Sequence, residues 1–414
     1  MSYLEKLLDG ADVAWLPLEE ITIKISSGGT PKTGVSEYYD GNIPWLRTQE
    51  VDFDEIWETG VKITEAGLKN SSAKWIPENC VILAMYGATV GKIGINKIPM
   101  ATNQACANIQ LDAEIADYRY VFHFLAMQYE YIKSLGSGSQ TNINAGIVKK
   151  LQIPIPCPDD PSRSLEIQAE IVRILDAFTS LTAELTAELT MRKKQYNYYR
   201  EQLFTFDENE VPHLPMGQDD IGAFIRGGGL QKKDFTETGV GCIHYGQVYT
   251  YYGTYAHETK SFVSEDFAKK ARIAKTGDLV IATTSENDED VCKAVAWLGK
   301  EDIAVSSDAC IYRHNLNPKY VAYFFQTEQF QKQKSPYITG TKVRRVNADN
   351  LAKILIPVPS PEEQARIVTI LDKFDSLTNS ISEGLPREIK LRQKQYEYYR
   401  DLLLNFPKPE EVAA

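Results

Sequence analysis

The feature that most constrains this chain is an internal duplication. Residues 167–178 (IQAEIVRILDAF) recur 196 residues later as residues 363–374 (EQARIVTILDKF). Residues 195–200 (QYNYYR) recur 200 residues later as residues 395–400 (QYEYYR). Because separate matches fall at nearly constant offsets, the chain contains two copies of one structural unit, and its fold must have two similar halves.

Each copy carries a helical pattern of apolar residues at alternating spacings of four and three. In the first copy these are Ile167, Ile171, Ile174, Phe178, Leu181 and Leu185, and in the second they are Ile367, Ile370, Phe374, Leu377 and Ile381. This spacing is typical of a coiled-coil seam, although a buried stripe on an ordinary helix would show it too. Two seams in one chain most simply pack against each other. Residues 3–8 resemble residues 199–204, which predicts that the N-terminus lies beside the C-terminal helix.

The two helical regions differ in one respect. Residues 181–189 spell LTAELTAEL, a duplicated Thr-Ala-Glu-Leu unit, and each unit adds about 6 Å to a continuous helix. We expect Leu181, Leu185 and Leu189 to belong to a spacer of defined length. The second region instead contains Gly384 and Pro386, which predict a break with a new helical segment beginning near the proline.

Residues 15–150 and 215–353 mix short β-rich runs with turns and one expected helix each, over residues 118–131 and 320–331. The predicted fold is α/β (α+β): two globular modules separated by two long helices packed as an antiparallel coiled coil, with a pseudo-two-fold repeat. The expected domains are 1–155, a first module with an N-terminal helical stub; 156–208, a central helix; 209–357, a second module; 358–408, a C-terminal helix; and 409–414, a tail.

The sequence lacks the motifs of several function classes. Residues 87–92 (GATVGK) are one residue short of a phosphate-binding loop and have no following Ser or Thr. The six cysteines form no CxxC pair, and the five histidines have no metal-ligand spacing. No apolar run approaches the ~18 residues of a membrane span, and the N-terminus resembles no signal peptide. We therefore expect a cytoplasmic, soluble protein that is not an enzyme, holds no metal and has no membrane contact.

Polar loops in both modules are candidates for contacts to DNA, because Arg suits guanine, Gln and Asn suit adenine, and Lys suits phosphate. The net charge of −11 implies that any such contact is local and that a partner supplies much of the charge neutralisation. The alternative for each loop alone is an ordinary solvated turn. The candidates are Thr30, Lys32, Arg47, Thr48, Gln49, Ser139, Gln140 and Asn142 in the first module, and Lys232, Lys233, Tyr245, Gln247, Thr284, Lys342, Arg344 and Arg345 in the second.

Tyrosine and arginine are dense near the ends of both helical regions, and both residue types are favoured at protein interfaces. We expect a partner-binding surface there, with packing inside the chain as the alternative. Its residues are Tyr196, Tyr199, Arg200, Tyr396, Tyr399 and Arg400.

The order of these segments resembles the specificity subunit of a type I restriction–modification system. The motifs that carry the resemblance are residues 15–18 (WLPL), 26–31 (SSGGTP) and 43–47 (IPWLR), together with the two copies of the Tyr-rich motif. The Thr-Ala-Glu-Leu duplication is similar to that of the IC group of this family. The second module departs from the pattern, since Gly228-Gly229-Leu230 stands where the first has Gly28-Gly29-Thr30-Pro31.

The resemblance implies a non-catalytic subunit in which each module is a target recognition domain for one half of a bipartite sequence in double-stranded DNA. The helices would set the spacer between the halves and dock two methyltransferase subunits, and motor–nuclease subunits would complete the complex. S-adenosylmethionine, ATP and Mg would belong to those partners, with no cofactor in this chain. Two alternatives remain open at this stage: a coiled-coil scaffold without DNA readout, and an enzyme with an active site built from the loops.

Overall fold

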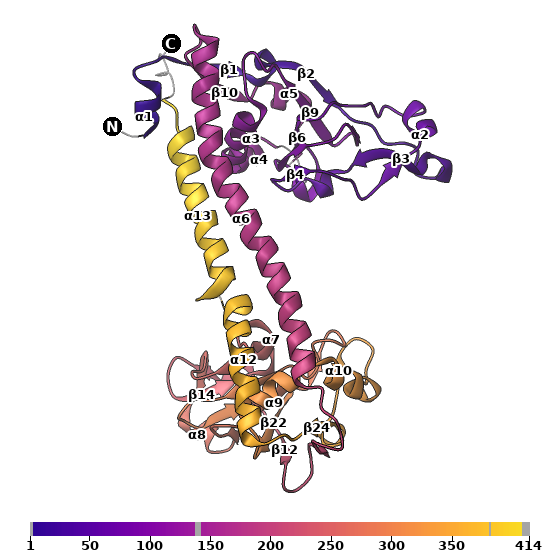
Figure 1. Cartoon of the computed structure of the whole chain (residues 1–414), viewed down its shortest axis with the longest axis vertical. Helices are drawn as coiled ribbons and strands as arrows, with labels where there is room; N and C mark the ends of the chain where they lie inside the picture. The colour runs from indigo at the N-terminus through magenta and orange to yellow at the C-terminus, as the bar shows by residue number, and fades with distance from the viewer. Residues whose placement is uncertain (1–2, 137–141, 381, 408–414) are drawn as a thin grey trace. The chain divides into compact units, whose positions relative to one another are not determined.

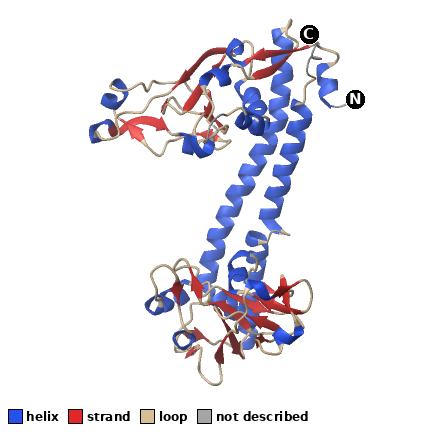
Figure 2. Cartoon of the chain, turned by 180° about the vertical axis from the view of Figure 1, so that it is seen from behind, coloured by secondary structure: helices blue, strands red, loops and turns tan. Residues whose placement is uncertain are grey.

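The computed structural model of the chain describes residues 3–136, 142–380 and 382–407, and it divides into two compact units. Unit 1 comprises residues 1–184 and 390–414, and unit 2 comprises residues 185–389. Each unit combines an α/β module with part of the long helical segments, as the views from both sides show (Figure 1, Figure 2). The predicted fold class, with two α/β modules, long helices and an internal repeat, is confirmed.

The module of unit 1 is built on a five-stranded sheet with the strand order β2-β9-β6-β7-β4. The central strand β6 is buried at every residue, as its continuous apolar sequence requires. A three-stranded sheet, β5-β3-β8, and the antiparallel pair β1-β10 complete the module. The strands are β1 (Val13–Pro17), β2 (Thr22–Ser27), β3 (Tyr39–Leu46), β4 (Glu55–Ile56), β5 (Lys62–Ile63), β6 (Val81–Ala84), β7 (Ile93–Asn96), β8 (Ala101–Thr102), β9 (Cys106–Leu111) and β10 (Gln152–Pro156).

The helix expected over residues 118–131 is two helices in the structure, α3 (Tyr118–Met127) and α4 (Tyr129–Ser134), with Gln128 between them. The side chain of Asp117 caps α3 by accepting hydrogen bonds from the first backbone N–H groups of the helix. The other short helices of this unit are α1 (Tyr3–Leu8), η1 (Leu18–Ile21), η2 (Ser36–Tyr38), η3 (Thr48–Glu50), α2 (Glu65–Lys69), η4 (Gly87–Thr89) and α5 (Ala145–Lys149).

The module of unit 2 repeats this architecture. Its five-stranded sheet has the order β12-β22-β18-β20-β15, with antiparallel neighbours except for a parallel last pair, as in unit 1. A second sheet, β13-β16-β14-β21-β17, and the pairs β11-β24 and β19-β23 complete it. The strands are β11 (His213–Pro215), β12 (Gly222–Arg226), β13 (Phe235–Thr236), β14 (Val240–Ile243), β15 (Tyr255–Ala256), β16 (Ser261–Val263), β17 (Arg272–Ala274), β18 (Leu279–Ala282), β19 (Thr284–Ser285), β20 (Ala294–Trp297), β21 (Ile303–Val305), β22 (Ala309–His314), β23 (Arg344–Arg345) and β24 (Leu355–Pro357).

The helix expected over residues 320–331 is likewise divided, into α9 (Pro318–Phe324) and α10 (Glu328–Lys334), because Thr327 caps a new helix. The remaining short helices of unit 2 are η5 (Lys232–Asp234), α7 (Tyr245–Thr250), α8 (Glu265–Ala268), η6 (Ser335–Tyr337) and α11 (Ala348–Leu351).

Matched hydrogen bonds show that the two modules share one backbone arrangement, which we call the frame. The hydroxyl of Tyr120 donates to the carbonyl oxygen of Pro154 at 2.7 Å, and that of Tyr320 donates to Pro357 at 2.9 Å. Burial raises the pKa of both phenols, so both remain protonated donors. In each unit this bond joins the helix that follows the main sheet, α3 or α9, to the strand that precedes a long helix, β10 or β24.

The first long helix, α6 (Pro161–Leu203), is continuous through the Thr-Ala-Glu-Leu duplication. Ile167 and Ile171 belong to the core of unit 1, whereas Leu181 is 36% exposed. The predicted seam is therefore buried beside the module and more open at the duplication. Leu185 and Leu189 are half-buried.

The C-terminal helices α12 (Pro361–Asn379) and α13 (Gly384–Leu404) pack against α6. In unit 1 the ring of Phe178 stacks on Tyr399 of α13, with centroids 5.1 Å apart. In unit 2 Tyr196 stacks on Phe374 of α12 at 6.0 Å. Each unit therefore pairs its own part of α6 with a C-terminal helix through stacked aromatic rings.

The break expected from Gly384 and Pro386 is confirmed. Gly384 has φ +72°, and a Cβ there would lie 2.3 Å from the carbonyl oxygen of Ser376. Only glycine fits this left-handed and crowded position, so α12 ends at Asn379 and α13 begins at Gly384.

The N-terminus of unit 1 lies beside the end of α13, also as predicted. Leu4 and Leu8 of α1 share a hydrophobic core with Leu403. The indole Nε1 of Trp15 donates to the carbonyl oxygen of Pro407 at 2.9 Å.

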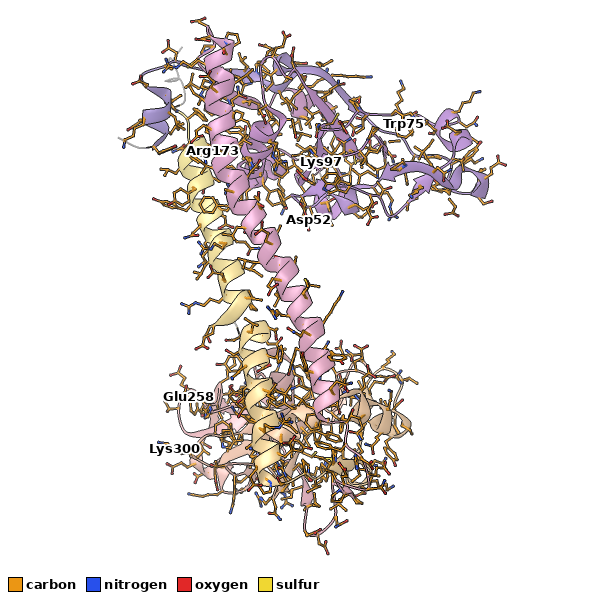
Figure 3. The ribbon with its side chains drawn as sticks, viewed as in Figure 1. Asp52, Trp75, Lys97, Arg173, Glu258 and Lys300 are labelled. Carbon is orange, nitrogen blue, oxygen red and sulfur yellow. The ribbon has the colours of Figure 1, made fainter. Side chains whose placement is uncertain are left out.

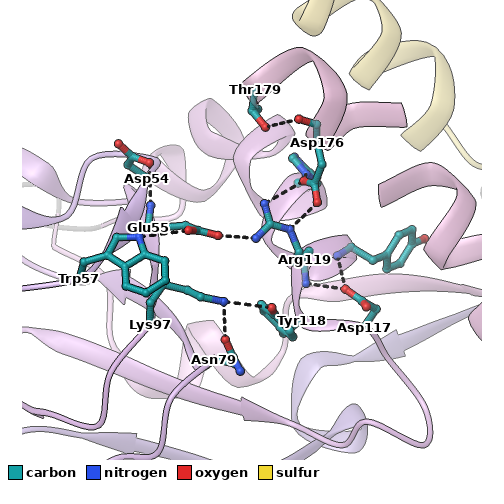
Figure 4. A network of polar contacts seen from close by, with 12 residues as sticks. Asp54, Glu55, Trp57, Asn79, Lys97, Asp117, Tyr118, Arg119, Asp176 and Thr179 are labelled. Carbon is teal, nitrogen blue, oxygen red and sulfur yellow. Dashed lines mark hydrogen bonds and ion pairs between the residues drawn. The ribbon is translucent and has the colours of Figure 1, made fainter. Parts of the chain in front are cut away.

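A polar network joins the module of unit 1 to α6 (Figure 4). The carboxylate of Asp176 accepts hydrogen bonds from Nε and Nη2 of Arg119 at 2.5 and 3.0 Å, and His123 Nε2 lies 2.9 Å from it. Burial acts to raise the pKa of Asp176, but the hydrogen bonds from His123 and Arg119 outweigh it and hold that pKa below its usual value. Arg119 also pairs with Glu55 of β4, so the network reaches the edge of the sheet.

Unit 2 has a corresponding network 196 residues later in the sequence. Asp372 of α12 accepts hydrogen bonds from Lys319 Nζ and from the hydroxyl of Tyr323, each at 2.7 Å. The same helix position therefore holds each module in place, although the donors differ.

We expect Asp176→Ala to lower the free energy of unfolding by about 1.5–3 kcal/mol, because Arg119 and His123 lose a charged hydrogen-bond acceptor. Arg173→Ala, which removes only an exposed ion pair with Glu170 on the same helix, should cost less than about 0.5 kcal/mol. Urea unfolding of the two variants measures the difference, and equal losses would contradict this role for Asp176.

Candidate nucleic-acid interface

The glycine-rich loop of the first module is packed rather than flexible, in contrast to the expectation. Gly28 and Gly29 are both buried, and Trp45 Nε1 donates to the carbonyl oxygen of Gly29 at 2.9 Å. Thr30 donates a side-chain hydrogen bond to Gln104, and Lys32 is exposed. The glycines therefore fix the loop, and Lys32 projects from it as a cation that a phosphate can reach.

The three adjacent candidates Arg47, Thr48 and Gln49 have different surroundings. Arg47 is half-exposed and its Nε lies 3.4 Å from Oε1 of Glu50. Thr48 is buried, so its side chain is not available to a ligand in this structure. Gln49 is exposed on η3.

The structure brings η3 close to the other candidate loop of this module. The 3₁₀ helices η3 and η4 are neighbours. Oδ1 of Asn142 accepts a hydrogen bond from the backbone N of Gly87 at the start of η4, at 3.4 Å. Gln49 and Asn142 thus belong to one surface of the module, while Ser139 and Gln140 lie outside the described residues.

In the second module the strand pair β19-β23 brings several candidates together. Thr284 pairs with Arg345, and Lys342 lies in the exposed hairpin that leads into β23. The Thr284 side chain is buried and that of Arg345 is exposed. Arg344 is bound within the module, with Nε 2.8 Å from Oδ1 of Asp288.

The remaining candidates of the second module lie around α7. Gln247 has both ends of its amide occupied, because Oε1 accepts from the backbone N of His244 and Nε2 donates to Ser261 at 2.7 Å. Tyr245 is half-buried against the His244 ring. Burial and then the nearby charge of Lys232 lower the pKa of His244, which places that lysine close to α7. Lys232 and its neighbour Lys233 are exposed on η5.

The two candidate surfaces occupy matching places in the repeated frame. The backbone N of Ile143 donates to Met85 O at 3.0 Å in unit 1, and that of Val346 donates to Thr283 O at 3.2 Å in unit 2. The loop before each donor therefore meets the end of the central strand in the same way. A residue missed from the sequence is Arg226, which stands 200 positions after Ser26 and lines a cavity with Thr284 and Arg345. The repeat offset was the signal that could have found it.

The proposed docking tyrosines are divided between the interior and the surface. Tyr196 is buried, and the hydroxyl of Tyr396 lies 3.0 Å from His123 Nδ1. These two tyrosines therefore pack inside the chain, which was the alternative to a partner-binding surface. Tyr199 and Tyr399 stack on helix residues with one face and remain about 40% exposed, at 42% and 38%.

The two arginines beside these tyrosines are also engaged within their units. Arg200 lies over the Tyr196 ring and pairs with Glu201, and Arg400 lies over the Tyr396 ring and pairs with Asp401.

No group of three or more His, Cys, Asp or Glu side chains is arranged to hold a metal ion in the described residues. In the same residues no helix is long and apolar enough to cross a membrane. Figure 3 labels charged side chains of both signs in both modules: Asp52 and Lys97 in the first, and Glu258 and Lys300 in the second.

Comparison with known proteins identifies the family. The family model of the type I restriction modification DNA specificity domain matches twice, over residues 16–191 and 216–391. The type I restriction enzyme EcoR124I/EcoR124II specificity subunit of Escherichia coli is 37% identical over 100% of this chain and 99% of its own length. The EcoprrI specificity subunit of Escherichia coli is 32% identical over 92% of each chain.

Solved structures support the same fold. The type I restriction–modification S subunit from M. genitalium aligns with a TM-score of 0.54 at 14% identity, covering 97% of this chain and 98% of that one. A chain from a study of type I complex assembly and conformational transition aligns with a TM-score of 0.60 at 14% identity, covering 95% and 97%.

This chain belongs to the family of type I restriction–modification DNA specificity subunits. As such it provides DNA sequence specificity in a restriction–modification system and is not the catalytic part of that system.

The packing of the glycine-rich loop yields a test. A Cβ on Gly29 would lie 2.3 Å from backbone atoms of Ser72 and Ala73, so Gly29→Ala should lower the free energy of unfolding by about 1–3 kcal/mol. Gly34 in the same loop has nothing within 4 Å of its Cβ position, so Gly34→Ala should stay within about 0.5 kcal/mol of the wild type. Equal unfolding midpoints for the two variants would show that the loop is not packed as described.

Proposed function

We propose that each module is a target recognition domain that binds one half of a bipartite sequence in double-stranded DNA. The observation that carries this proposal is the repeated frame with different side chains at its loops. Asn142 in the first module corresponds to Arg345 in the second, while the backbone hydrogen bonds beside them are the same. One fold with two sets of polar groups is what two different half-sites require.

The candidate residues at these loops remain predictions. The exposed members are the ones we propose for direct contact: Lys32 and Gln49 in the first module, and Lys232, Lys233, Lys342 and Arg345 in the second. Thr48, Thr284 and Gln247 are buried or fully hydrogen-bonded, and we propose that they position their loops. The proposed domain boundaries are those given from the sequence.

The partners follow from the family. We propose that the helices dock two methyltransferase subunits through the exposed ring faces of Tyr199 and Tyr399, and that motor–nuclease subunits join them. S-adenosylmethionine, ATP and Mg would be bound by those subunits. The complex would work in the cytoplasm, where chromosomal DNA lies. Family membership favours this function over a scaffold that does not contact DNA.

The test is a genome-wide map of methylated bases in cells that express this chain with its methyltransferase subunit, compared with cells that express the methyltransferase alone. We expect a split motif that appears only when this chain is present. A stable complex that produces no new motif would contradict the proposal and favour the scaffold.

Deletion of one Thr-Ala-Glu-Leu unit tests the spacer. It removes about 6 Å from the continuous helix α6, and one base pair occupies about 3.4 Å of DNA. We expect the unread spacer of the motif to shorten by one or two base pairs while both half-sites keep their letters. The same methylation map measures it, and a change in the half-site letters would contradict the role of these residues as a spacer.

A further inference from the structure

A cavity in the second module is lined by charged side chains that the described chain leaves unpaired. The cavity has a volume of about 300 Å³ and lies where β12 ends, beside the strand pair β19-β23. Its lining includes Arg226, Thr284, Asp308, Tyr337 and Arg345.

Both arginines are available to a ligand. Within the described residues the guanidinium groups of Arg226 and Arg345 make no hydrogen bond or ion pair, and neither does the carboxylate of Asp308. The adjacent Arg344, by contrast, is held by Asp288. Arg226, Asp308 and Arg345 therefore belong to the lining of one cavity without pairing with one another.

The backbone around these side chains is well fixed. Arg345 and Thr339 exchange two backbone hydrogen bonds of 2.9 Å, and Gly340, with φ +90°, makes the turn between them. The carbonyl oxygen of Asp308 accepts from both the backbone N and Oγ1 of Thr283, each at 3.0 Å. Because the backbone is already ordered, the ordering cost of binding a ligand here is limited to that of the side chains.

The shared frame does not require these charges. The corresponding positions of the first module are Ser26, by the offset of 200, and Ala105 and Asn142, by the matched hydrogen bonds. None of the three is charged. The two arginines and the aspartate therefore belong to what distinguishes the second module.

We propose that Arg226, Asp308 and Arg345, which belong to the lining of this cavity, together recognise the major-groove edge of one G·C base pair in the half-site of the second module. Arg345 and Arg226 donate to O6 and N7 of guanine, and Asp308 accepts from the N4 amino group of cytosine. A phosphate would meet the negative charge of Asp308 in the same cavity, whereas a G·C pair presents acceptors and a donor side by side. The assignment rests on the proposed function.

The test uses the methylation map with the complete complex and five forms of the chain: wild type, Arg345→Lys, Arg345→Ala, Asp308→Ala and Arg272→Ala. Lysine keeps the charge but loses the bidentate fork of arginine. We expect Arg345→Lys and Asp308→Ala to relax the same G·C position by about 5- to 150-fold in preference and to leave the other half-site unchanged. Arg272 is exposed on the same module but outside the cavity, so Arg272→Ala should keep the wild-type motif.

Three outcomes would overturn the assignment. One is an unchanged motif with Arg345→Lys and uniformly weaker methylation with Arg345→Ala at an unchanged unfolding midpoint, which would indicate a phosphate contact. Another is relaxation at different positions by the Arg345 and Asp308 variants. The third is relaxation at an A·T pair. A wild-type chain that yields no split motif would instead refute the proposed function itself.

Discussion

The structure of each unit depends on one half-buried carboxylate on a long helix. Asp176 on α6 and Asp372 on α12 receive hydrogen bonds from the helix that follows the main sheet of their own module. A half-buried charge costs desolvation free energy unless all its hydrogen-bond partners are in place. The network therefore favours one orientation of the module on its helix. The loops that we propose for DNA contact belong to the same modules, so the network also fixes how these loops are placed relative to the helix of their own unit.

The two modules of the chain share one backbone arrangement but carry different side chains at their loops. Both modules use the same strand order in their main sheet, the same Tyr-to-Pro hydrogen bond and the same junction at the end of the central strand. The side chains at the loops differ, with Asn142 in one module and Arg345 in the other. Under the proposed function, these loop side chains would be what distinguishes the two half-sites.

Much of this architecture could be predicted from the sequence because it depends on local patterns and on the repeat. The helical spacing predicted α6, the glycine at 384 predicted the break before α13, and the likeness of the N-terminus to the segment after the Tyr-rich motif predicted its place beside the C-terminal helix.

The candidate DNA-contact and docking residues were harder to predict, because the exposure of each side chain depends on contacts between segments that are distant in the sequence. Gly29 is buried against residues 72–73, Gln247 is occupied by Ser261, and Tyr196 lies under Phe374. Nothing near these residues in the sequence indicates those partners. The division of residues 118–131 into α3 and α4 at Gln128 was also not indicated by the apolar pattern.

The central claim is that the two modules recognise their half-sites independently. The most direct measurement replaces residues 15–150 with the corresponding segment of a family member of different specificity and maps methylated bases in cells that contain the methyltransferase. The account predicts a motif in which one half-site changes and the other half-site and the spacer remain. A motif that stays whole, or one in which both half-sites change, would contradict it.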